Sequence, residues 1–121
     1  MLSVLSKRAD FLAANRGLRV ARPGFVLLVR PNAADAMRFG ITVTKKIGNA
    51  VVRNRMKRRL RVLLRELLPV QGLAAHDHVL IGRGGGVERD FARLRDELSA
   101  ALARAAAGQG DPPRRTGGKR K

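Results

Sequence analysis

The 121-residue sequence predicts a small α+β fold, a mixed sheet packed with helices in the order α-β-β-β-α-β-α. Two long segments carry a helical apolar period, and short β-branched or aromatic runs lie between them. Gly and Pro residues separate these segments. The length corresponds to one domain with one modest core. We therefore expect a split βαβ sandwich in which the helices cover a small sheet.

The N-terminal part is expected to begin with a helix over residues 7–16. Ser6 is a suitable N-cap, and Gly17 suits the position just past the last helical turn. Residues 18–22 read as a short extended piece that a Pro-Gly pair ends.

Two strands are expected next. Residues 25–29, Phe-Val-Leu-Leu-Val, form a continuous apolar run that is typical of a buried strand. In residues 39–44, Phe39, Ile41 and Val43 alternate with Gly or Thr, which predicts a strand with two unlike faces. The short polar loop between the two strands favours an antiparallel hairpin.

The C-terminal half is dominated by two helical patterns. The first runs from residue 50 to residue 68 and is expected to stop at Pro69. A strand over residues 78–81 and a glycine-rich turn over residues 82–86 follow. The second helical pattern covers residues 90–107. Residues 1–107 are thus expected to form a single α/β sandwich domain, and residues 108–121 a disordered basic tail with little to bury.

The charge is the strongest compositional signal. With 26 Lys and Arg against 9 Asp and Glu, the net charge is +17, which favours a polyanionic partner. The absence of cysteine excludes disulfides and thiolate chemistry. No apolar run reaches the roughly 18 residues of a membrane-spanning helix. The first 22 residues contain no signal-like apolar segment, so we expect a cytoplasmic protein without a membrane partner.

The helix expected over residues 50–68 separates two faces. Its apolar stripe consists of Val52, Met56, Leu60, Leu63 and Leu67. The opposite face carries Asn54, Lys57, Arg58, Arg61 and Arg65. A solvated face usually mixes charges, because like charges three or four residues apart repel each other. This face favours a bound polyanion over plain solvation, and its preference for Arg favours nucleic acid. Asn54 fits either an RNA contact or an ordinary surface position.

The start of this helix is a candidate phosphate site. Asn49 is a good N-cap, and Lys45 and Lys46 lie just before it. Free N–H groups at a helix N-terminus favour phosphate. The alternative is a plain cap beside solvated lysines.

Residues 45–58, with Arg61, resemble the signature of the bacterial ribonuclease P protein family. The hallmark of that signature is Arg-Asn-Arg, here Arg53-Asn54-Arg55. Residues 8–11, 25–27 and 39–41 are also similar, and the resemblance covers about residues 3 to 105.

The resemblance implies an accessory subunit of the endonuclease that removes the 5′ leader of precursor tRNA. In that family the catalytic centre is RNA with Mg²⁺. We therefore expect a monomeric protein that binds no cofactor alone, does not cut RNA alone, and pairs 1:1 with the ribonuclease P RNA subunit. The fold implied is an α-β sandwich with a left-handed βαβ crossover. The RNA contacts carried over by motif position are Lys45, Lys46, Arg53, Asn54, Arg55, Lys57, Arg58 and Arg61, beside which Asn49 and Arg65 are expected from the helix pattern.

The resemblance also implies a cleft between sheet and helices that holds the single-stranded leader. Its lining would be Phe11, Val26, Leu28 and Thr42. Family members often carry a second aromatic residue in the first helix and a Tyr in the first strand, where this chain has Asn15 or its neighbours and Leu28. Apolar contact and electrostatics would then hold the leader in place of base stacking.

Three other functions stay open on composition alone: a ribosomal RNA-binding protein, a histone-like DNA-compacting protein and a stand-alone nuclease. The Arg-Asn-Arg motif and the preceding Lys-Lys-Ile-Gly-Asn argue against the first. A DNA-compacting protein would need no leader-sized apolar cleft and should bind duplex DNA as well as structured RNA. Scattered carboxylates argue against the third. His76 and His78 lack an obvious third metal ligand. The glycines of residues 82–86 lack the Lys-Ser/Thr of a P-loop, so they predict a turn.

Overall fold

The computed structural model describes residues 2–5 and 7–111 of the chain. Within these residues the predicted order of helices and strands is confirmed, with one short strand added in front. The strands and helices are β1 (Leu2–Val4), α1 (Arg8–Ala13), β2 (Leu18–Ala21), β3 (Phe25–Pro31), β4 (Met37–Thr42), α2 (Ala50–Gln71), β5 (His76–Gly82) and α3 (Phe91–Ala106). Three single 3₁₀ turns are η1 (Ala14–Arg16), η2 (Lys45–Ile47) and η3 (Gly84–Gly86).

The described strands form one mixed sheet in the order β1-β4-β5-β3-β2. Strand β4 is parallel to β1 and β5, whereas β3 is antiparallel to β5 and β2. The expected hairpin between residues 25–29 and 39–44 is therefore wrong, because β5 lies between β3 and β4. The apolar run of β3 is buried. The strand lies inside the sheet, with β2 paired along one edge and β5 along the other.

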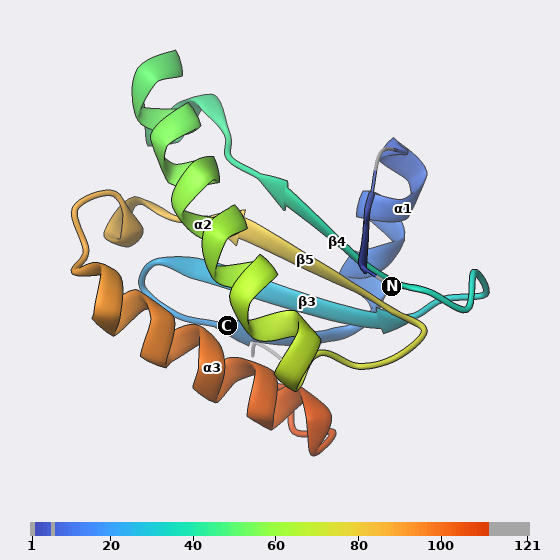
Figure 1. Ribbon diagram of the computed structural model, residues 1–121. Helices are drawn as coiled ribbons and strands as arrows, with labels where there is room; N and C mark the ends of the chain where they lie inside the picture. Colours follow the sequence, from blue (N-terminus) through green and yellow to red (C-terminus); the bar gives the residue numbers. More distant parts are fainter. Residues whose placement is uncertain (1, 6, 112–121) are drawn as a thin grey trace, which may run out of the picture.

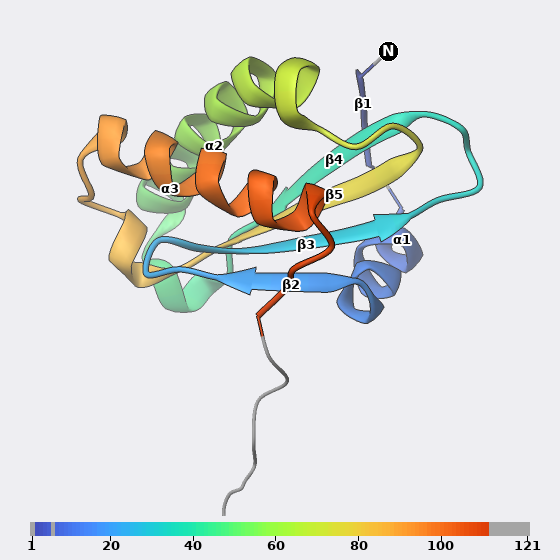
Figure 2. The same ribbon diagram turned by 90° about the horizontal axis from the view of Figure 1, so that it is seen from below.

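The helices cover both faces of the sheet. Figure 2 shows α2 and α3 on one face and α1 on the other. In Figure 1, the parallel strands β4 and β5 point to the upper left, and α2 passes in front of the sheet. When the picture is turned so that both strands point upward, β5 lies to the left of β4. The β4-α2-β5 crossover is left-handed, as the family resemblance implied and against the general preference for right-handed crossovers.

Two apolar clusters hold these layers together. Phe25 and Leu27 of β3 point toward α2 and α3 and join the larger cluster. Val26 and Leu28 point to the opposite face and join a smaller cluster beneath α1, with Val79 of β5. The alternation along β3 explains why its sequence shows no polar side: each face of this strand meets a helix layer.

Helix boundaries differ from the predicted ones at two places. Helix α2 continues through Pro69 to Gln71. Proline lacks the N–H that would bond the Arg65 carbonyl four residues earlier, but Arg65 lies on the solvent side. The buried Leu67 and Leu68 keep the last turns on the core.

Helix α1 is shorter than expected and ends in the 3₁₀ turn η1. Lys7 occupies its N-cap position without a side-chain cap bond, and Ser6, the predicted cap, lies outside the described residues. Of the predicted tail, residues 112–121 also lie outside the described part of the chain.

Candidate nucleic-acid interface

The N-terminus of α2 is built by local contacts. The Asn49 side chain accepts a hydrogen bond from the Val52 N–H at 3.0 Å, so the predicted N-cap is confirmed. A Cβ on Gly48 would lie 3.0 Å from the Cβ of Val52, so this close turn requires glycine. Arg53 Nη1 donates to the Gly48 carbonyl at 2.9 Å. These bonds fix the turn between β4 and α2 and hold Lys45 and Lys46 beside the helix start.

The structure brings the predicted RNA contacts onto one surface, which we call the basic face of α2. Eight of these side chains are exposed and two, Arg53 and Lys57, are half-buried. The exposed members are Lys45, Lys46, Asn49, Asn54, Arg55, Arg58, Arg61 and Arg65. The apolar stripe on the other side is buried as predicted, except that Val52 is half-buried and Leu64 and Leu68 join it.

The basic face carries almost no neutralising charge. Among the described residues, its single carboxylate neighbour within 4 Å is Glu88, 3.9 Å from Arg55, and both side chains are largely exposed. Such an exposed pair contributes little. Glu66, the one acid within α2, pairs instead with Arg95 of α3. From Arg53 to Arg65 the cations extend over roughly 18 Å at 1.5 Å per residue, which spans several phosphates of a nucleic-acid strand.

Arg59 has a structural role that differs from that of the predicted RNA contacts and that the amino-acid sequence did not reveal. Its guanidinium donates to the carbonyls of Gly86, Val87 and Arg89 and lies 5.5 Å from the centre of the Phe91 ring. Arg59 therefore fastens the loop between β5 and α3 to α2.

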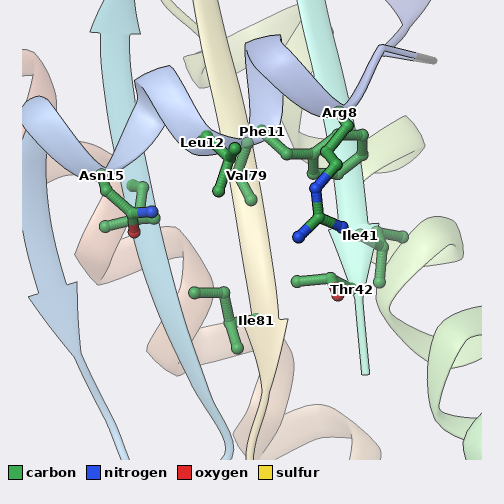
Figure 3. Close-up of a pocket in the computed structure, with 9 residues that line it drawn as sticks. Arg8, Phe11, Leu12, Asn15, Ile41, Thr42, Val79 and Ile81 are labelled. Atoms are coloured by element: carbon green, nitrogen blue, oxygen red, sulfur yellow. The ribbon is translucent and has the colours of Figure 1, made fainter. Parts of the chain in front are cut away.

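The second surface is a groove between α1 and the sheet, with a volume of about 400 Å³ (Figure 3). Three of the predicted cleft residues, Phe11, Leu28 and Thr42, line it together. The fourth, Val26, is buried in the apolar cluster beneath α1 and is not among the lining residues. The residues that were not predicted are Arg8, Leu12, Asn15, Ile41, Val79 and Ile81.

The groove depends on a close contact between α1 and β4. Phe11 lies against Gly40, where a Cβ would stand only 2.5 Å from Cε1 and Cζ of the ring. A larger residue at position 40 would force the Phe11 ring out of this position. This contact explains why glycine stands between the apolar residues Phe39 and Ile41 of β4, at the position that faces α1.

The lining of the groove combines an apolar floor with polar groups. Leu28, Val79 and Ile81 form apolar surface. Arg8 brings a guanidinium and Asn15 an amide (Figure 3). This chemistry suits a single-stranded nucleotide chain, whose bases pack on apolar surface and whose phosphates bind cations. Strand β4 contributes to the groove and leads directly to Lys45, so it connects the groove to the basic face of α2.

A polar network supports the sheet beside the groove. Asp77 is buried and accepts hydrogen bonds from Arg38 at 2.7 and 2.9 Å and from Asn32 at 2.8 Å. Asp10 of α1 lies 3.6 Å from the Arg38 guanidinium. The hydrogen bond with Asp77 raises the pKa of Arg38 above its ordinary value. This network ties α1, β4 and β5 together.

The two histidines are engaged in the fold. Nδ1 of His78 donates to the Arg38 carbonyl at 3.2 Å, and Nε2 accepts from the Leu73 N–H at 3.1 Å. Burial lowers the pKa of His78, which favours the neutral ring. His76 bonds the Ala74 carbonyl at 2.8 Å. In residues 2–5 and 7–111, no group of three His, Cys, Asp or Glu side chains is placed to hold a metal ion.

No helix within the described residues is long and apolar enough to cross a membrane. A small α+β sandwich with an arginine-rich face is typical of the class of RNA-binding proteins.

Comparison with known proteins gives the family. A family model described as Ribonuclease P matches residues 2–106, so the chain belongs to the ribonuclease P protein family, whose members take part in tRNA 5′ processing. The ribonuclease P protein component of Erythrobacter litoralis (strain HTCC2594) is 74% identical over 113 residues, which cover 93% of each chain.

Solved structures agree with this assignment. A Staphylococcus aureus RNase P protein mutant with defective mRNA degradation activity has a TM-score of 0.74 and 31% identity, covering 85% of this chain and 87% of that one. The RNase P protein from Thermotoga maritima has a TM-score of 0.72 and 33% identity, covering 83% and 94%.

Proposed function

We propose that this chain binds the ribonuclease P RNA through the basic face of α2 and holds the 5′ leader of precursor tRNA in the groove beneath α1. One copy of the protein pairs with one RNA in the cytoplasm. The RNA and Mg²⁺ supply the catalytic centre, and the protein increases the affinity for precursor tRNA. The isolated protein does not cut RNA.

The observation that carries this proposal is the pairing of two unlike surfaces across β4. Among the described residues, Arg55 is the one member of the basic face with a carboxylate within 4 Å, so most of its cations are available for the phosphates of a folded RNA. The groove has an apolar floor with a guanidinium and an amide beside it, which suits a single strand. A complex in which a folded RNA subunit binds one surface and the single-stranded 5′ leader of the substrate binds the other would use both.

The carboxylates support a binding role over a hydrolytic one. Asp77 is paired with Arg38, Glu97 with Arg89, and Glu66 with Arg95. The family resemblance assigns the catalytic Mg²⁺ to the RNA, and we keep that assignment in this proposal. The contribution of the chain to phosphodiester hydrolysis is then to position the leader relative to the RNA.

The test is cleavage of precursor tRNA at near-physiological Mg²⁺ with the protein alone, a bacterial ribonuclease P RNA alone, and the two together. We expect efficient cleavage at the mature 5′ end only when the protein and the RNA are mixed. An unstructured mRNA incubated with the protein alone is the second arm, chosen because of the activity named for the Staphylococcus aureus protein. Degradation of that mRNA would overturn the claim that the chain does not cut RNA, and a mixture no better than RNA alone would overturn the subunit role.

A further inference from the structure

Helix α1 forms one wall of the groove, but few contacts hold it in place. Arg8, Phe11 and Leu12 line the groove from this helix (Figure 3). None of the α1 side chains is fully buried. Phe11 lies against Gly40 of β4, and the buried Ala14 anchors η1 just beyond the helix. The position of α1 over the sheet therefore depends on a small number of side-chain contacts.

Among residues 2–5 and 7–111, a single ion pair joins a side chain of α1 to the sheet. A carboxylate oxygen of Asp10 lies 3.6 Å from Nη1 of Arg38, a residue of β4. The Asp10 and Arg38 side chains are 29% and 22% exposed, so water screens the pair less than it would on an open surface. Asp10 itself does not line the groove. The ion pair therefore acts on the groove by holding the helix that forms its wall.

The sheet holds the Arg38 guanidinium in a fixed orientation. Its Nε and Nη2 donate to the two carboxylate oxygens of the buried Asp77, at 2.7 and 2.9 Å. Asn32 donates to the same carboxylate at 2.8 Å and to the Ala36 carbonyl at 2.9 Å, which also fixes the loop between β3 and β4. Pairing at two points sets the plane of a guanidinium. The remaining nitrogen, Nη1, is thus presented to α1 from a fixed place on the sheet.

We propose that Asp10 is a positioning residue for the leader, because its contact with Arg38 keeps α1 where the groove is formed. The inference rests on the proposed function, since it takes the groove as the leader site. Without the contact, α1 spends part of its time in positions that do not form the groove. The apparent affinity for the leader then falls in proportion to the fraction of molecules in which the groove is formed.

The substitution Asp10→Ala separates positioning from a simple effect of charge. It removes a negative charge near the groove, so electrostatics alone predicts tighter RNA binding, whereas loss of positioning predicts weaker binding. Alanine has a higher helix propensity than aspartate, which offsets the loss of an acid from the first turn of α1. Asp96→Ala is the matched control. Asp96 is exposed on α3, on the other face of the sheet (Figure 2), and its replacement changes the net charge equally.

The measurement is the Kd of the assembled holoenzyme for precursor tRNA with a long leader and with a leader too short to reach the groove. We expect Asp10→Ala to weaken binding of the long leader about fivefold, since a partly exposed ion pair contributes at most about 1 kcal/mol. Binding of the short leader should not change. Asp96→Ala should bind both substrates at least as tightly as the parent protein. Equal or tighter binding of the long leader by Asp10→Ala overturns the proposal.

Two further readouts distinguish positioning from general damage to the fold. Asp10→Glu keeps a carboxylate on a longer side chain, which still reaches Arg38, so it should retain most of the affinity for the long leader. With saturating precursor tRNA, the single-turnover cleavage rate of Asp10→Ala should equal that of the parent, because the bound leader keeps α1 in place. Failure of glutamate to restore affinity, or an equal loss of affinity for the ribonuclease P RNA in Asp10→Ala, would contradict a positioning role.

The parent protein reports separately on the proposed function. If the parent holoenzyme binds long-leader and short-leader substrates equally, the groove is not the leader site, and the proposed function and this inference both fail. If the parent prefers the long leader and Asp10→Ala keeps that preference in full, the groove remains the leader site and the positioning role of Asp10 alone is wrong.

Discussion

Replacing Arg61 with glutamine tests the basic face of α2 with little risk to the fold. Arg58 and Arg61 are exposed, and among the described residues neither has a carboxylate within 4 Å. Removing such side chains changes the free energy of unfolding by no more than about 0.5 kcal/mol. Any larger effect on RNA binding therefore comes from lost contacts with the RNA.

The expected magnitude follows from the number of phosphate contacts removed. Each lost contact reduces the slope of log Kd against log salt by about 1. Between 50 and 200 mM salt, a slope of 1 corresponds to about a fourfold change in affinity. The ratio of Kd at 200 mM salt to Kd at 50 mM salt should therefore be about fourfold smaller for Arg61→Gln than for the parent protein. For the double variant Arg58→Gln with Arg61→Gln, it should be about sixteenfold smaller.

The assay is a titration of ribonuclease P RNA with each variant at several salt concentrations. Arg93→Gln is the matched control: Arg93 is exposed and lies about 200° around α3 from Arg95, which faces α2 through Glu66. The slope should be unchanged in this control. If Arg61→Gln and Arg93→Gln alter the slope equally, the cations act as diffuse charge and the basic face is not a defined contact surface.

Three further predictions concern the groove and the network beside it. Gly40→Val places atoms into the Phe11 ring, so it should cost about 1–3 kcal/mol in urea unfolding and weaken leader binding while RNA-subunit binding persists; equal stability and leader affinity would contradict the packing argument. Asp77→Ala leaves the Arg38 guanidinium without its buried partner and should lower the free energy of unfolding by about 3 kcal/mol, a loss that a change below 1 kcal/mol would refute. The pKa of His78 is lowered in the fold. As pH falls below about 6.5, His78 therefore takes up a proton in the unfolded chain before it does so in the folded chain, which favours unfolding. Stability should then decline from pH 7.5 to 5.5, and His78→Gln should flatten that decline; identical pH profiles would show that another group titrates.

Helix α2 was predictable because its signals are local. The Asn49 cap, the apolar stripe and the cationic face all lie within one continuous segment, and each is where the pattern indicated. The end of the helix was misjudged at Pro69, since a proline in the last turns deprives just one solvent-side carbonyl of its donor. Arg59 was not separable from its neighbours, because its partners lie on the distant loop between β5 and α3.

The order of the strands was beyond local reasoning. A short loop between residues 25–29 and 39–44 fits a hairpin equally well, and only the pairing of both strands with β5 excludes it. The same pairing places Val79 and Ile81 in the groove, where no sequence pattern had put them. The family resemblance supplied Phe11, Leu28 and Thr42, and it also supplied the left-handed crossover that general rules disfavour.

The most direct test of the two-surface account is site-specific crosslinking in the assembled holoenzyme bound to precursor tRNA. The chain has no cysteine, so single cysteines can carry the crosslinker without background. Leu12→Cys places it at the groove, Arg61→Cys on the basic face of α2, and Ala100→Cys on the exposed side of α3 as a control. The account predicts crosslinks from position 12 to the 5′ leader, from position 61 to the ribonuclease P RNA, and none from position 100. Crosslinks from position 12 to the ribonuclease P RNA alone, or from position 61 to the leader alone, would contradict it.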